Sequence, residues 1–187
     1  MSASKWVSGD VMEHILAACT WENELALRLS MSYGLRIGDV LRMPATVLRT
    51  GRWSLREEKT GKRRYLRLSD TFIRELRGIA GKVYVFEHRT DWRRHRTRQA
   101  VYKDLKRAAD LFRIKGISPH SARKIYAVNA FHASHDLKKV QRLLNHDSEA
   151  VTILYALADE LARTRRRGRE RGSAPQMRDR AAGTPEG

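Results

Sequence analysis

The sequence predicts an α+β fold: a mostly helical single domain with a small antiparallel β-hairpin or three-stranded sheet on one edge. Apolar residues recur at helical spacing through most of the chain. The stretch 52–68 instead alternates polar and apolar residues with period two around a Gly-containing turn, which is typical of a β-hairpin. No period of roughly 20–50 residues repeats, which excludes solenoids and propellers.

Three helices are expected before the hairpin. Ser8 precedes apolar residues at helical spacing and is the expected cap of the first helix. The second helix carries the leucines of 25–31 and ends at Gly34, since glycine commonly follows the last helical turn. The third covers 37–41 and is stopped by Pro44, which cannot continue a helix.

The hairpin and the segments after it follow in order. Strands are expected at 52–56 and 65–68, joined by the turn 59–62. Asp70 is the expected cap of the next helix, and the apolar run 83–86 is predicted to be a short third strand.

Helical spacing returns near the C-terminal half of the chain. One helix is predicted over 98–113, and another begins at Ser118 and Pro119, since proline is favoured in the first helical turn. Two more are expected near 136–144 and 148–161.

The chain is predicted to divide into one folded domain over 1–162 and a tail over 163–187. The tail contains no Leu, Ile, Val or aromatic residue and is dominated by Gly, Pro, Arg and Ala. Such a segment cannot bury enough apolar surface to fold, so we expect a basic, disordered tail.

The charge of the chain indicates its partner. The 187 residues contain 38 Lys and Arg against 21 Asp and Glu, which gives a formal net charge of +17. Polyphosphate backbones are the usual partners of such a field, because each neutralised phosphate releases a counterion. An anionic membrane surface is the competing interpretation, but no basic amphipathic helix has an apolar face that a core would not use, so no membrane contact is expected.

Disulfides, metals and cofactors are not expected. Cys19 is the single cysteine, which excludes an internal disulfide and a multi-Cys zinc site. The pairs His132 with His135 and His88 with His95 lack the companion ligands of a metal motif. No secretory signal and no membrane-spanning run is present, so these features favour a reducing compartment.

Six side chains are candidates for chemistry. Each one alone is weak, since single Arg, Lys and His residues are mostly solvated and a Tyr among apolar residues is mostly part of a core. Two of them lie three residues apart and project from one face of a helical turn. The six are Arg36, Lys59, His120, Arg123, His146 and Tyr155.

Together these residues have a specific order and spacing. The motifs are GLRIGDVL around Arg36, KTGKR from Lys59, HSAR from His120, LLNH ending at His146, and Tyr155 nine residues later. They resemble the catalytic domain of the tyrosine recombinases, the phage-integrase family. The resemblance covers about residues 8–160 and is closest from Pro119 to Tyr155.

The resemblance implies a metal-free transesterification of DNA. Tyr155 would attack a phosphodiester and form a 3′-phosphotyrosyl link with release of a 5′-hydroxyl. Arg36 and Arg123 would bind the non-bridging oxygens, because planar guanidiniums stay charged and fork onto phosphate. His120 would be the base or orienter.

The remaining roles follow from the same resemblance. Lys59 would protonate the leaving oxygen, with Lys62 as the alternative, and His146 would bind a phosphate oxygen. Asp39, three residues after Arg36, would support and orient that arginine. DNA contacts are expected from Lys62, Arg63, Arg89, Arg93, Arg94, Arg96, Arg98 and Lys124.

One departure from the family concerns its N-terminal domain. Family members carry a separate helical, core-binding domain before the catalytic one, whereas only about seven residues precede the first predicted helix here, so that domain is expected to be absent. The loop 89–98, with five arginines and Trp92, is the hypothetical substitute for its DNA contacts.

The expected function is a site-specific recombinase that acts on double-stranded DNA. It would self-associate on DNA as a tetramer in a synaptic complex, with a monomer away from DNA as the alternative. The expected compartment is the cytoplasm, prokaryotic or viral in origin and associated with the nucleoid. Two alternatives stay open: a catalytically idle DNA-binding or regulatory protein of the same fold, and a type IB topoisomerase-like enzyme that nicks and relaxes DNA.

Overall fold

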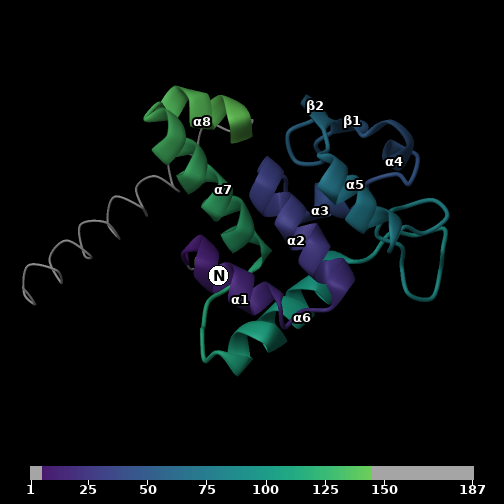
Figure 1. The fold of residues 1–187 in the computed structure, drawn as a ribbon, viewed down its shortest axis with the longest axis horizontal. Coiled ribbons are helices and arrows are strands. Elements are labelled where there is room, and N and C mark those ends of the chain that lie inside the picture. The colour runs from purple at the N-terminus through teal and green to yellow at the C-terminus, as the bar shows by residue number, and fades with distance from the viewer. Residues whose placement is uncertain (1–5, 145–187) are drawn as a thin grey trace, which may run out of the picture. The chain divides into compact units, whose positions relative to one another are not determined.

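The computed structural model describes residues 6–144, which form eight helices and two strands (Figure 1). No helix in this range is long and apolar enough to cross a membrane. In chain order the elements are α1 (Gly9–Leu16), α2 (Trp21–Tyr33), α3 (Ile37–Leu41), α4 (Val47–Thr50), β1 (Arg52–Arg56), β2 (Arg63–Arg67), α5 (Asp70–Arg77), α6 (Arg98–Leu111), α7 (Pro119–Ser134) and α8 (Leu137–Leu144).

This arrangement confirms the predicted fold class, a mostly helical domain with a small antiparallel sheet. Strands β1 and β2 pair antiparallel, with Arg52 opposite Arg67 and Arg56 opposite Arg63. Trp53 and Leu55 of β1 are buried, and the other residues of the strand are exposed. The polar and apolar residues that alternate in the sequence therefore lie on opposite faces of the strand.

The prediction of a third strand at 83–86 is wrong. Val85 N donates to Met43 O and Ala45 N donates to Val83 O, both at 2.9 Å, but the pairing stops at an isolated bridge between Pro44 and Tyr84. Proline has no N–H to extend a ladder, so the sheet among residues 6–144 has two strands.

The helix starts follow local capping chemistry. Ser8 caps α1 as predicted, accepting from Val11 N at 3.4 Å. The cap of α5 is Ser69, which accepts from Phe72 N at 3.3 Å, so the prediction of Asp70 is off by one position. Both serines have extended backbones that place the hydroxyl over the open N–H groups of the first turn.

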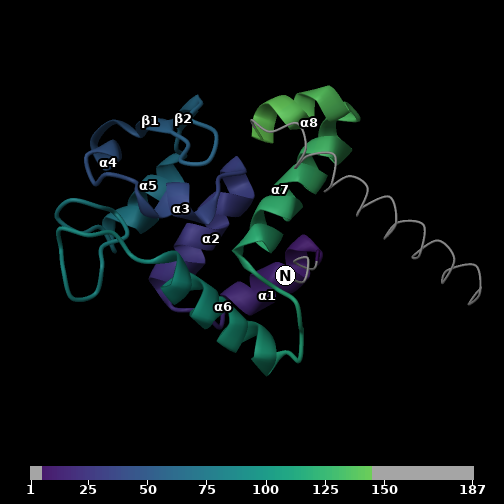
Figure 2. The ribbon, with the colours of Figure 1, turned by 180° about the vertical axis from the view of Figure 1, so that it is seen from behind.

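Helix α2 is the centre of the core. It packs against α3, α6 and α7, and Figures 1 and 2 show α7 and α8 on one side of it and α4, α5 and the hairpin on the other. Met12, Ile15, Leu25, Leu29 and Leu105 are completely buried in this core. Each such side chain stabilises the fold by roughly 1.5–3 kcal/mol through its removal from water.

Gly34 is required by the contact between α2 and α7. Its φ of 62° lies in the left-handed region, and it ends α2 two residues before Arg36. A Cβ atom at this position would lie 2.4 Å from the Tyr126 ring of α7. The sharp turn into α3 therefore depends on a residue with no side chain.

We expect Gly34→Ala to destabilise the domain by about 2–4 kcal/mol, from left-handed strain and overpacking together. The matched control is Gly61→Ala, because Gly61 has a similar φ of 65° but only the Arg56 side chain near its Cβ position, at 3.7 Å. The control should lose only the strain part, about 1–2 kcal/mol. Urea unfolding followed by circular dichroism measures both; equal losses would contradict the role of the Tyr126 contact.

Candidate active site

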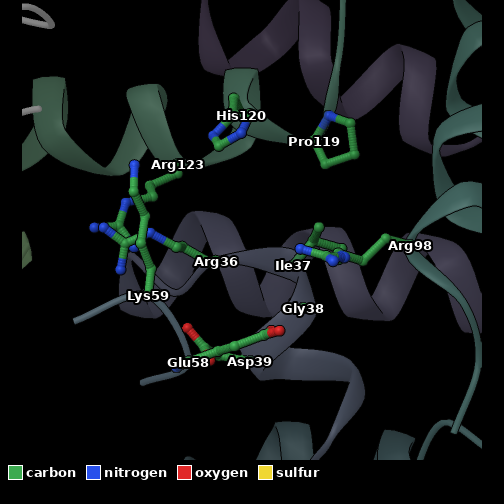
Figure 3. Close-up of a pocket in the computed structure, with 10 residues that line it drawn as sticks. All are labelled: Arg36, Ile37, Gly38, Asp39, Glu58, Lys59, Arg98, Pro119, His120 and Arg123. Carbon is green, nitrogen blue, oxygen red and sulfur yellow. Dashed lines mark hydrogen bonds between the residues drawn. The ribbon is translucent and has the colours of Figure 1, made fainter. Parts of the chain in front are cut away.

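A cavity of about 360 Å³ brings together four of the six predicted catalytic residues. Figure 3 shows Arg36, Lys59 and Arg123 gathered at one side of this pocket, His120 on the α7 side, and Arg98 reaching in from the opposite side. The lining residues are Arg36, Ile37, Gly38, Asp39, Glu58, Lys59, Arg98, Pro119, His120 and Arg123. Positions that span more than 80 residues of sequence therefore meet in one site.

Arg36 is placed by the turn between α2 and α3. It is the N-cap residue of α3, with an extended backbone, and its side chain is 11% exposed. Nη1 donates to Glu57 Oε2 at 2.9 Å. The guanidinium is thus held at the wall of the pocket before any ligand binds.

Lys59 lies in a turn whose residues on both sides of it are hydrogen-bonded, one to α3 and one to Glu57. Glu58 N donates to Asp39 Oδ1 at 3.0 Å, and Thr60 Oγ1 donates to Glu57 Oε2 at 2.9 Å. Glu57 N also donates to Lys62 O at 3.0 Å across the turn. The exposed Lys59 side chain therefore starts from a backbone that is hydrogen-bonded on both sides.

His120 and Arg123 come from the first turn of α7. Ser118 and Ser121 form a reciprocal capping box there, and Ser118 Oγ also accepts from His120 N at 3.3 Å. Arg123 is 1% exposed, and its Nη2 donates to Leu144 O at 2.8 Å, which joins α7 to the end of α8.

Two predicted catalytic residues, His146 and Tyr155, lie outside the described residues. The predicted helix over 148–161 and the predicted tail over 163–187 also lie outside them. These expectations stay predictions.

The carboxylate that contacts Arg36 is Glu57, which the sequence analysis missed. Asp39, the expected support, accepts instead from Glu58 N and from Arg42 Nη2. The signal for Glu57 was present in β1, where Trp53 and Leu55 face inward with period two and the next inward position is 57. A carboxylate at an inward position beside the site lysine indicates a buried ion pair.

Glu57 remains ionised although it is buried. Burial raises its pKa, but the hydrogen bond from Thr60 and the charges of Arg64, Arg36 and Arg123 outweigh burial and hold the pKa below the usual value of a glutamate. The group therefore acts as a fixed negative charge at neutral pH.

The predicted DNA contacts lie in several parts of the structure. Arg98 lines the pocket, and Lys62 and Arg63 are exposed on the hairpin. Arg89, Arg93 and Arg94 are exposed in the loop before α6, and Lys124 is half-buried on α7. Arg96 differs, because its Nε donates to Asn23 Oδ1 at 2.7 Å and ties the loop to α2.

Trp92 adds an aromatic surface to this loop. It is 41% exposed, with Arg93 Cζ 4.7 Å and Lys82 Nζ 5.5 Å from its ring. Such cation–π contacts restrain the two cations and leave their charge at the surface.

The pocket has the chemistry of a phosphate site. Three guanidiniums, those of Arg36, Arg98 and Arg123, and the Lys59 ammonium provide donors and positive charge. Arginine can fork onto two phosphate oxygens at once. The His120 imidazole at the same cavity is a group that can accept or donate a proton. No three candidate metal ligands cluster anywhere in the part of the chain that the structure describes.

Comparisons with known proteins agree with this site. The chain is 30% identical over 139 residues to "Tyrosine recombinase XerD" of Rhizobium meliloti (strain 1021), covering 69% of this chain and 45% of that protein. It is 33% identical over 159 residues to "Putative integrase/recombinase y4qK" of Sinorhizobium fredii (strain NBRC 101917 / NGR234), covering 80% and 51%. The chain thus spans about half the length of these curated relatives.

The fold is also similar to that of a solved structure, the lambda integrase dimer bound to a COC′ core site. The TM-score is 0.67 at 20% identity, with 82% of this chain and 48% of that chain covered. The sequence profile described as "Phage integrase family" matches residues 5–161. The chain belongs to the phage integrase family.

Proposed function

We propose that the chain is a site-specific DNA recombinase that cuts and rejoins DNA through a 3′-phosphotyrosyl intermediate, without a metal or cofactor. The observation that carries the proposal is that Arg36, Lys59 and the His120–Arg123 pair, from three separate segments, line one cavity. Membership of the phage integrase family supports the same chemistry.

The two arginines would bind the reacting phosphate. Negative charge accumulates on the non-bridging oxygens as phosphorus becomes five-coordinate, and preorganised guanidiniums stabilise that charge more than the ground state. Arg36 and Arg123 are largely buried, where electrostatic interactions are stronger than in water.

The covalent step transfers one proton from the attacking oxygen and one proton to the leaving oxygen. The Tyr155 phenol oxygen attacks phosphorus and gives its proton to His120. The bond from phosphorus to the 5′-oxygen breaks, and Lys59 gives a proton to that oxygen. The phosphotyrosyl link keeps the energy of the phosphodiester, so a 5′-hydroxyl from a second strand can reverse the step and reseal the DNA.

Double-stranded DNA is the proposed partner, and the chain would assemble on it as a tetramer. The net charge of +17 supports DNA binding. The similar lambda integrase structure is a dimer bound to DNA. A cytoplasmic, nucleoid-associated location belongs to the same proposal, and the curated relatives described above are bacterial.

A covalent trap tests the proposal. The substrate is a pool of duplexes with a randomised segment followed on its 3′ side by a nick, so that the short cleaved piece diffuses away and the adduct accumulates. We expect wild type to form an adduct that survives denaturing gels and Tyr155→Phe to form none, because phenylalanine has no nucleophile.

The same trap separates the alternatives. Duplex binding without any adduct by wild type would contradict the proposal and favour an idle DNA-binding protein. Once the trapped site is known, exchange between two marked sites indicates a recombinase, whereas relaxation of supercoiled plasmid without exchange indicates a topoisomerase-like enzyme. Tyr155→Phe should bind duplex DNA within about twofold of wild type, since one hydroxyl adds little to a binding energy dominated by phosphate contacts.

Sulfur in place of the leaving 5′-oxygen tests the role of Lys59. A thiol has a pKa of about 8.5 and can leave without a proton, so this substrate needs no general acid. We expect Lys59→Ala to slow adduct formation by about 10²–10⁴-fold on ordinary DNA and by less than about tenfold on the sulfur substrate. Lys62→Ala is the matched control, and a sulfur rescue of Lys62→Ala instead would move the role to that residue.

The salt dependence of DNA binding tests the loop before α6. Arg93→Gln with Arg94→Gln should lower the slope of log affinity against log salt by up to about two, since each phosphate contact contributes about 0.9. The control removes the same charge from two exposed arginines of other elements, Arg49→Gln with Arg74→Gln. Equal slopes for the two double variants would contradict a specific contact by the loop.

A further inference from the structure

We propose that Glu57 is a positioning residue that sets the spacing between Arg36 and Lys59, because its buried carboxylate binds both Arg36 and the turn that carries Lys59. This inference rests on the proposed function, because it concerns the residues assigned to the phosphate and to the leaving oxygen. Glu57 would not touch DNA; it would act through its two neighbours.

The hydrogen bonds of Glu57 divide between the two sides of the site. Oε2 accepts from Arg36 Nη1 and from Thr60 Oγ1, each at 2.9 Å. Its side chain is 0% exposed, so these bonds are shielded from competing water. One oxygen atom therefore joins the arginine at the start of α3 to the turn of the hairpin.

The turn that Glu57 holds is the turn that carries Lys59. Thr60 follows Lys59 directly, and Gly61 N donates to Glu57 O at 2.9 Å. Glu58, on the other side, is fixed by its N–H bond to Asp39. Since both neighbours of Lys59 are anchored, the position of its Cα relative to α3 depends on these contacts.

Arg64 fixes the carboxylate itself. Its Nη1 lies 3.3 Å from Glu57 Oε1, and its Nη2 donates to Tyr33 O at 2.8 Å. Tyr33 is the last residue of α2, three positions before Arg36. Glu57 is thus linked to the turn that places Arg36 in two ways, directly through Arg36 and indirectly through Arg64 and Tyr33.

The positive charges around Glu57 explain why an acidic residue is favourable at this position. Arg36, Arg64 and Arg123 all act electrostatically on Glu57, so three guanidiniums lie near one another. Like charges repel, and an arginine without a fixed counter-charge would adopt several conformations.

Glu57→Gln tests the inference, because it keeps the size of the side chain and removes its charge. On the trapped DNA site we expect adduct formation to slow by about 10- to 100-fold, since a misplacement of about 1 Å can cost a factor of 10². Thr60→Val is the second variant, which keeps the carboxylate and removes one donor; we expect a loss of about three- to tenfold.

A substrate with a methylphosphonate at the scissile position distinguishes positioning from general damage. It replaces a charged non-bridging oxygen by a methyl group, so it has less need of Arg36. The loss caused by Glu57→Gln should be smaller on this substrate than on phosphate, because only the part that acts through the Lys59 turn remains. In an Arg36→Ala background, Glu57→Gln should likewise cost less than it does in wild type, because residues that act as a unit are not additive.

Asp104→Asn is the matched control for the loss of a half-buried, hydrogen-bonded carboxylate. Asp104 lies on α6, where it accepts hydrogen bonds from Thr20 N, Thr20 Oγ1 and Asn23 Nδ2. It does not line the pocket that holds Arg36 and Lys59. It should leave the adduct rate of the folded protein within about threefold of wild type, since it changes no contact of the site.

The outcomes separate the two proposals. An adduct from wild type with an unchanged rate in Glu57→Gln, or equal losses on phosphate and methylphosphonate, would overturn the positioning role alone. No adduct from wild type would overturn the proposed function and this inference with it.

Discussion

A buried ion pair between Glu57 and Arg36 joins the two parts of the molecule that carry the pocket. The hairpin and α3 are separate elements; α3 packs against α2 and α6, and the bond between Arg36 and Glu57 joins its start to the hairpin. A carboxylate buried without partners would be costly, so its pairing with Arg36, Arg64 and Thr60 is a condition for the fold as well as for the site. The geometry of the pocket therefore follows from a requirement of folding.

The same logic applies to α7. Its first turn presents His120 while Arg123 points inward to the carbonyl of Leu144, so a single helical turn provides one exposed and one buried site residue. The capping box of Ser118 and Ser121 fixes where that turn begins. A shift of the helix start by one residue would rotate both side chains by about 100° away from the pocket.

Most of the fold could be predicted from the sequence, since it depends on local chemistry. The cap at Ser8, the left-handed end of α2 at Gly34 and the alternation of β1 are properties of short segments. The strand expected at 83–86 was wrong because its partner segment contains Pro44, and that partner cannot be identified without the tertiary structure. The short helix α4 carries no periodic signal, since four residues barely exceed one helical turn.

The residues of the site were predicted by their order in the chain, whereas the contacts between them were not. The motif identified Arg36 and Lys59, and helix spacing suggested Asp39 as the support of Arg36, because three residues make one helical turn. Arg36 is the N-cap of α3 and has an extended backbone. Helical spacing therefore does not predict which residues its side chain contacts. Glu57, a carboxylate that binds Arg36, comes from another element, 21 residues away in sequence.

An acidic residue beside a phosphate site has a cost and a benefit that can be compared. Its charge lowers the positive potential that a DNA phosphate meets, so it weakens ground-state binding. Under the proposed function, a chain with a net charge of +17 would bind DNA through many phosphate contacts, whereas an arginine side chain has several alternative conformations on a basic surface. The ion pair with Glu57 favours one of them in the folded protein, so Arg36 and the Lys59 turn would be ordered before the proposed reaction begins. Weaker ground-state binding and a preorganised site would then favour the chemical step, because only interactions that are stronger in the transition state than in the ground state raise the rate.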